Sequence, residues 1–116
     1  MIIRGNELEP KTMEKPRDGR GSAINIAYEA IHGLEGRIKI FSVVDLQPDS
    51  MVGYHKHEND TEIYLMLDGT GVVNDNGIHD ILRPGDMLIT NFGESHSIEN
   101  KSSSPITFLA IIVDKL

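Results

Sequence analysis

Short apolar runs separated by turn residues make up most of the chain after residue 21. Gly, Pro, Asn and Asp recur about every eight to twelve residues, and the runs between them are rich in Ile, Val, Leu and Phe, which is typical of an all-β sandwich or barrel. Stretches with a helical period are missing. The predicted strands cover residues 22–31, 37–46, 51–57, 62–67, 70–74, 78–82, 87–90, 95–99 and 106–113.

Two of these segments carry more specific signals. Asn76 and Gly77 stand between two apolar runs, and both residue types tolerate the positive φ that a tight hairpin requires. The run at 106–113, ITFLAIIV, is almost continuously apolar. It is therefore predicted to be buried on both faces or to lie at an interface.

The first 21 residues differ from the rest. They hold two prolines, three glycines and mixed charges without a sustained period, so residues 1–21 are predicted to form an N-terminal arm. A chain of 116 residues is the size of one ordinary core, so 1–116 is expected to be a single domain.

Composition and charge narrow the classes of partner that the protein can have. The formal net charge is -7 and no cluster of Lys or Arg is present, which argues against nucleic-acid or anionic-membrane partners. No segment approaches the roughly 20 apolar residues of a membrane span, and the N-terminus lacks the apolar stretch of a secretory signal. The chain has no Cys. A cytoplasmic protein is the default expectation.

The candidate chemistry lies in the segment GYHKHENDTEIYLMLDG, residues 53–69. On a strand, His55 and His57 project to one side and Lys56 to the other. Glu62 opens the next predicted strand and can bring a carboxylate to the two imidazoles, which would form part of a metal shell. His96, at the start of a later strand, offers a further donor.

The spacing of these residues resembles the two paired motifs of the cupin superfamily. In the first motif, His-x-His is followed after three or four residues by Glu and after six more by Gly; the matching residues here are His55, His57, Glu62 and Gly69. The second motif is matched by Gly85, Gly93, His96 and Asn100. The resemblance covers about residues 37–113. Asp49 stands where the first motif opens with Gly, and Asn91 where the second has Pro; both residue types suit turns.

The resemblance implies a double-stranded β-helix, that is, a jelly-roll barrel with 37–113 as its motif-bearing part. It implies a divalent transition metal held by His55, His57, Glu62 and His96, and this donor set leaves Mn, Fe, Ni, Co, Cu and Zn open. Arms in such proteins often cross onto a neighbour's sheet, and an open sheet edge invites pairing, so a homodimer is expected.

The leading functional hypothesis is a metal-dependent enzyme acting on a small carboxylate or carbohydrate-like metabolite, by decarboxylase, isomerase or dioxygenase-type chemistry. The alternative is a non-catalytic module that binds or senses a small molecule with the same site, and a third is a structural barrel without metal. No proton donor or acceptor is identified, so the catalytic residues stay unassigned.

Several simpler interpretations compete with these assignments. Glu62 could pair with Lys56, and His96 could be a hydrogen-bonded core histidine. Arg20, near the end of the arm, could reach the mouth of a pocket. The candidate pocket-lining residues are Tyr64, Met66 and Phe108, which would line the pocket if they point inward; the alternative for all three is packing in the core of the barrel.

Overall fold

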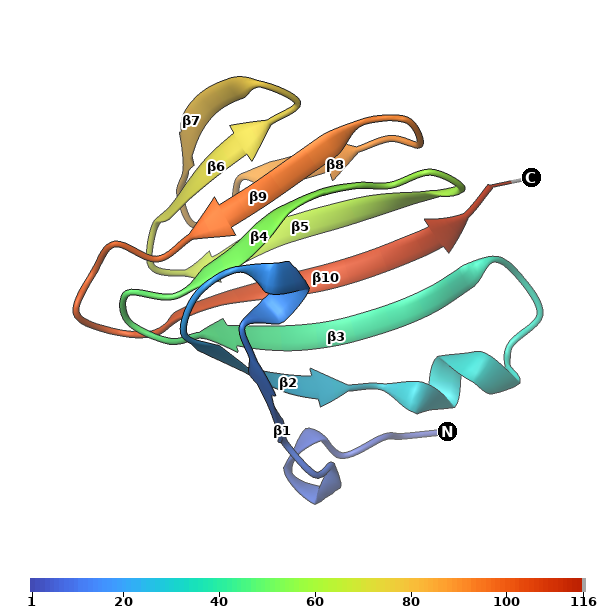
Figure 1. Cartoon of the computed structure of the whole chain (residues 1–116). Coiled ribbons are helices and arrows are strands. Elements are labelled where there is room, and N and C mark those ends of the chain that lie inside the picture. The colour runs from blue at the N-terminus through green and yellow to red at the C-terminus, as the bar shows by residue number, and fades with distance from the viewer. Residues whose placement is uncertain (116) are drawn as a thin grey trace.

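The computed structural model describes residues 1–115 and is built almost entirely from β-strands (Figure 1). The strands are β1 (Lys11–Glu14), β2 (Ser22–Ala27), β3 (Ile38–Leu46), β4 (Met51–Lys56), β5 (Asp60–Asp68), β6 (Gly71–Asp75), β7 (Ile78–Leu82), β8 (Met87–Thr90), β9 (Ser95–Glu99) and β10 (Ile106–Asp114). Three 3-10 turns are η1 (Gly5–Glu7), η2 (Pro16–Asp18) and η3 (Glu29–Gly33). Across residues 1–115, no helix has the length and apolar character needed to cross a bilayer.

The strands form two antiparallel sheets. One sheet has the order β1-β2-β3-β10-β5-β8 and the other β4-β9-β6-β7. Several strands that follow one another in the sequence, such as β4 and β5, lie in different sheets. This alternation between two sheets is the jelly-roll arrangement of a double-stranded β-helix. The predicted all-β jelly roll is therefore confirmed. The core is formed by buried apolar side chains from both sheets: Ala23, Val44, Leu46, Val52, Tyr64, Met66, Val73, Leu82, Leu88, Ile98, Ile106, Phe108 and Ala110.

Strand β10 is the centre of the six-stranded sheet, between β3 and β5. Ile106, Phe108 and Ala110 point into the core and are almost completely buried. Thr107 and Leu109 alternate with them and are half-buried. The continuous apolar run therefore covers one buried face and one partly exposed face, and burial on both faces is not observed.

The arm is more ordered than the sequence pattern predicts. Strand β1 pairs antiparallel with β2 of the same chain, with Lys11 opposite Asn25 and Glu14 opposite Ser22. All four residues of β1 are exposed, so the strand has no buried face to produce an apolar alternation. The predicted strand 22–31 is too long, since β2 ends at Ala27 and η3 follows.

Turns with positive φ appear where the residue types allow them. Asn76 and Gly77, at φ +51 and +100, connect β6 to β7 as a tight hairpin, as predicted. Asp49 has φ +57 in the turn before β4. Aspartate is among the non-glycine residues that tolerate this left-handed region, and glycine, which opens the first cupin motif at this position, tolerates it as well.

Asn100 closes one end of the barrel. Its side chain is fully buried, and its amide nitrogen donates to the carbonyl oxygens of Leu46 and Ser104 at 3.0 and 2.8 Å. Its Oδ1 accepts from the backbone N–H and the hydroxyl of Ser102 at 2.9 and 2.7 Å. One side chain therefore ties the end of β3 to the loop between β9 and β10.

Replacing Asn100 by Ala is expected to lower the free energy of unfolding by about 3 kcal/mol, because several buried polar groups lose their partner at once. Urea denaturation of the metal-free protein measures this change. Asn6→Ala, at an exposed position of the arm, is the matched control and should change the free energy by no more than about 0.5 kcal/mol. Equal stability of the two variants would contradict the role of Asn100.

Candidate metal centre

Both sheets contribute to the site that the sequence predicts. His55 on β4 lies directly opposite His96 on β9, and a register irregularity between Val52 and His55 shifts the pairing just before the histidine. His57 follows β4. Glu62 lies on β5 of the other sheet, so its carboxylate reaches the histidines across the interior of the barrel.

The four side chains converge. The Nε2 atom of His96 lies 3.2 Å from Nε2 of His55 and 3.1 Å from Nε2 of His57. Oε1 of Glu62 lies 3.0 Å from Nε2 of both His57 and His96. One donor atom from each of the four residues lies within 4.8 Å of all the others. The residues predicted from spacing are therefore brought together as one cluster that could hold a metal ion.

The opposite edge of each imidazole is held by a partner. Nδ1 of His55 lies 2.6 Å from the carbonyl oxygen of Gly53, and Nδ1 of His57 lies 2.6 Å from Oδ1 of Asp60. Both oxygens are acceptors, so Nδ1–H donates at each ring, and whenever a ring is neutral its Nε2 lone pair faces the cluster.

His96 is held in a similar way. Its Nδ1 lies 2.7 Å from the hydroxyl oxygen of Thr90, which is fully buried and stands opposite Glu62 in the pairing of β5 with β8. Its ring also stacks on Tyr64, with centroids 4.8 Å apart and an interplanar angle of 18°. The third imidazole is therefore oriented from its edge and from its face.

The donor chemistry fits a divalent transition metal. Imidazole nitrogen and carboxylate oxygen bind Zn-like ions at about 2.0 to 2.2 Å, and two such donors at right angles around an ion lie about 3.0 Å apart. The four distances of 3.0 to 3.2 Å within the cluster match this spacing. A cation between the donors would relieve the repulsion between lone pairs and a carboxylate that face one another.

The protonation states support this arrangement at His55 and Glu62. Burial lowers the pKa of His55 to about 4, so its ring is neutral at pH 7. Burial works to raise the pKa of Glu62, but hydrogen bonds from His57 and His96 outweigh it and hold the pKa at about 2. The hydrogen bond to Glu62 raises the pKa of His57, so a proton competes with a cation at that ring.

A cavity of about 330 Å³ opens beside the cluster. His55, Glu62 and Tyr64 lie in its wall, and most of the remaining wall is apolar, with Phe108 among its residues. Two of the three predicted pocket residues, Tyr64 and Phe108, thus line the cavity. Met66 is fully buried in the core, where its side chain packs beside Gly71.

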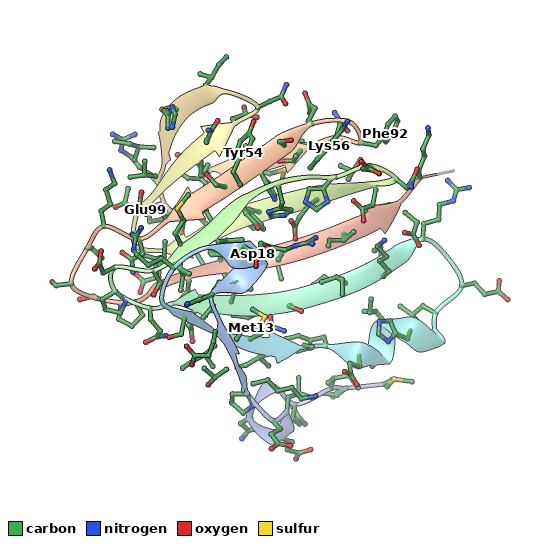
Figure 2. The ribbon with its side chains drawn as sticks, in the orientation of Figure 1. Met13, Asp18, Tyr54, Lys56, Phe92 and Glu99 are labelled. Carbon is green, nitrogen blue, oxygen red and sulfur yellow. The ribbon has the colours of Figure 1, made fainter. Side chains whose placement is uncertain are left out.

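The geometry rules out one of the two simpler interpretations of the cluster and is consistent with the other. Lys56 is exposed on the outward side of β4, as is Tyr54, whereas Glu62 contacts the histidines (Figure 2). His96 is buried, but its Nε2 faces two further imidazoles and a carboxylate. Glu62 therefore does not pair with Lys56, whereas His96 is both a buried, hydrogen-bonded histidine and a member of the cluster.

Two residues near the site were missed by sequence reasoning. Asp60, three residues after His57, orients that ring and is itself held by Nζ of Lys39 at 2.8 Å. Arg17 lines the cavity, whereas Arg20 turns away and contacts Glu99 at 2.6 Å. The acidic run after His57 was a signal for Asp60, but nothing in the sequence separated Arg17 from Arg20.

Comparisons with known proteins agree with this geometry. The family model described as Cupin domain matches residues 42–112. A Thermotoga maritima protein named oxalate-binding protein is 40% identical over 116 residues, which cover 97% of this chain and 93% of that protein. The crystal structure of a predicted oxalate decarboxylase from Thermotoga maritima has 38% identity and a TM-score of 0.89, covering 98% of this chain and 99% of that chain.

A more distant likeness concerns the fold alone. The structure of a sugar phosphate isomerase from a cupin superfamily, from Silicibacter pomeroyi, has 20% identity and a TM-score of 0.80. It covers 99% of this chain and 76% of that chain.

Replacing Asp60 by Ala is expected to weaken metal binding about 10- to 100-fold, because the ring of His57 loses the acceptor that orients it. Competition with a chromogenic chelator, using Zn²⁺ and Co²⁺, measures the affinity. Asp68→Ala, at an exposed position of β5, is the control and should leave the affinity unchanged. Wild-type affinity in Asp60→Ala would contradict the role given to Asp60.

Proposed function

The chain belongs to the cupin family, and on this premise we propose that it binds a divalent transition metal and, through the metal, a small carboxylate. The proposed ligands of the metal are His55, His57, Glu62 and His96. The observation that carries the proposal is the convergence of their four donor atoms beside a cavity. Four protein donors leave one position of a five-coordinate ion, or two positions of a six-coordinate ion, for a further ligand.

The cavity wall favours a small carboxylate over a carbohydrate derivative. A sugar phosphate presents many hydroxyl groups that need hydrogen-bond partners, whereas Ile40, Val44, Val52, Ala110 and Ile112 give the wall a largely apolar character. A carboxylate needs only the metal and one or two polar groups. The name of the relative, oxalate-binding protein, supports this class of ligand.

Metal-dependent decarboxylation of the bound carboxylate is the second candidate, and the name of the structural relative, predicted oxalate decarboxylase, supports it. In that reaction a carbon–carbon bond breaks, CO₂ leaves and a proton must reach the remaining carbon. Burial and the charge of Glu62 raise the pKa of Tyr64 well above its usual value, so the phenol stays protonated in the cavity wall, where it can donate a hydrogen bond but is a weak acid, and the proton donor stays unassigned. A bound metal would supply Lewis-acid polarisation of the carboxylate.

Protein purified without chelator is expected to contain about one metal ion per chain, and His57→Ala is expected to lose most of it. Elemental analysis measures the content. His79→Ala, at an exposed histidine of β7, is the matched control and should keep the metal. Equal metal content in His57→Ala and His79→Ala would contradict the proposed site.

Titration calorimetry with oxalate then tests the ligand. Binding is expected to the metal-loaded protein and not to the metal-free protein, and equal binding to both would refute a metal-mediated site. Release of CO₂ from the metal-loaded protein would select the decarboxylase, whereas binding without release would select the binding protein.

We also propose that the protein forms a homodimer through the outer face of the six-stranded sheet. Leu67, Met87 and Ile89 are 48%, 54% and 49% exposed on neighbouring positions of β5 and β8, and β8 is an edge strand. An apolar face beside an unpaired strand edge is suited to contact with a second copy.

Sedimentation at micromolar concentration is expected to give about twice the protomer mass of 12.9 kDa. Ile89→Lys should shift the mass toward the protomer, because it places a charge in the apolar face. Ile78→Lys, at an exposed position of β7 in the other sheet, is the control and should leave the mass unchanged. A wild-type mass of one protomer would contradict the dimer.

A further inference from the structure

Arg17 is the one cationic side chain, among the described residues, in the wall of the cavity beside the metal centre. It lines the same cavity as His55 and Glu62. Within residues 1–115 no acidic side chain forms an ion pair with Arg17, whereas Arg20 is engaged by both Glu99 and Asp49. The guanidinium of Arg17 therefore has its hydrogen-bond donors available to a molecule in the cavity.

The backbone that carries Arg17 has an uncommon conformation. Lys15, Arg17 and Asp18 have φ of +46, +53 and +58, three non-glycine residues in the left-handed region within four positions. Such residues are disfavoured and persist only where the surrounding structure imposes the conformation. Met13 and Asp18 mark the two ends of this part of the arm in Figure 2.

The turn is held against β4 by close backbone contacts. A Cβ atom on Gly53 would overlap the carbonyl oxygen of Arg17, and a Cβ atom on Gly19 would overlap the carbonyl oxygen of Met51. Arg20 and Met51 exchange two backbone hydrogen bonds of 3.0 and 2.7 Å. The same strand carries His55 two residues after Gly53, so the position of the turn is set relative to the metal centre.

We propose that Arg17 binds the second carboxylate of a dianionic ligand whose first carboxylate is bound by the metal. This inference rests on the proposed function and assigns its ligand class, a small dicarboxylate. A divalent cation and the Glu62 carboxylate leave one net positive charge, and Arg17 adds a second. A dianion balances both. Arg17 is exposed at the mouth of the cavity, and its planar guanidinium can donate two parallel hydrogen bonds to a carboxylate.

The test compares oxalate with oxamate, in which an uncharged amide replaces one carboxylate at nearly the same size. Both are titrated calorimetrically into metal-loaded wild type and Arg17→Gln. The variant is expected to lose about 10- to 100-fold in oxalate affinity, the range of a charge-assisted hydrogen bond, and to change by less than about threefold for oxamate. Arg4→Gln, at an exposed position of the same arm, is the control and should match wild type for both probes.

The outcomes separate this inference from the proposed function. Oxalate affinity that is unchanged in Arg17→Gln, or lowered no more than oxamate affinity, overturns the role of Arg17 while leaving the metal-bound carboxylate in place. Failure of metal-loaded wild type to bind either probe overturns the proposed function and the inference with it. Metal content and the unfolding midpoint of Arg17→Gln, measured alongside, confirm that the compared proteins carry the same site.

Discussion

The electrostatic repulsion among four closely spaced donor atoms is the main physical constraint on the interior of this barrel. The Nε2 atoms of three imidazoles and one carboxylate oxygen lie 3.0 to 3.2 Å from their neighbours, a spacing that is unfavourable unless a proton or a cation lies between them. The donors come from β4, β5 and β9, which belong to two different sheets. Closure of the jelly roll is therefore the condition for the cluster, and a bound cation would in turn stabilise the closed form.

The cluster is supported by a second layer of contacts that extends to the edge of the molecule. Asp60 holds the ring of His57 and is paired with Lys39, which also contacts Asp114 at 2.9 Å. Behind His96, Thr90 holds the Nδ1 edge, and Tyr64 covers the ring face. These partners restrict the imidazoles to orientations that point Nε2 inward, so little reorganisation is needed when a cation binds.

Alternation along a strand was sufficient to predict that His55 and His57 share a side, and motif spacing was sufficient to bring in Glu62 and His96. The hydrogen bonds behind the rings were not predictable, because they depend on side-chain rotamers and on the pairing of β5 with β8. Strand β1 was not predicted because none of its residues is buried, so its sequence has no apolar alternation. Only its pairing with β2 identifies it as a strand. Arg17 was missed because residue type does not predict its left-handed backbone.

The net charge of -7 and an anionic ligand are compatible, because the two act over different distances. Charges on the exposed surface are screened by salt over about 8 to 10 Å, whereas charges inside a largely apolar cavity are screened much less. A divalent cation in the cavity that Arg17 lines would add to a local positive potential there. An acidic surface is therefore compatible with the proposed binding of a small dicarboxylate at one confined positive site.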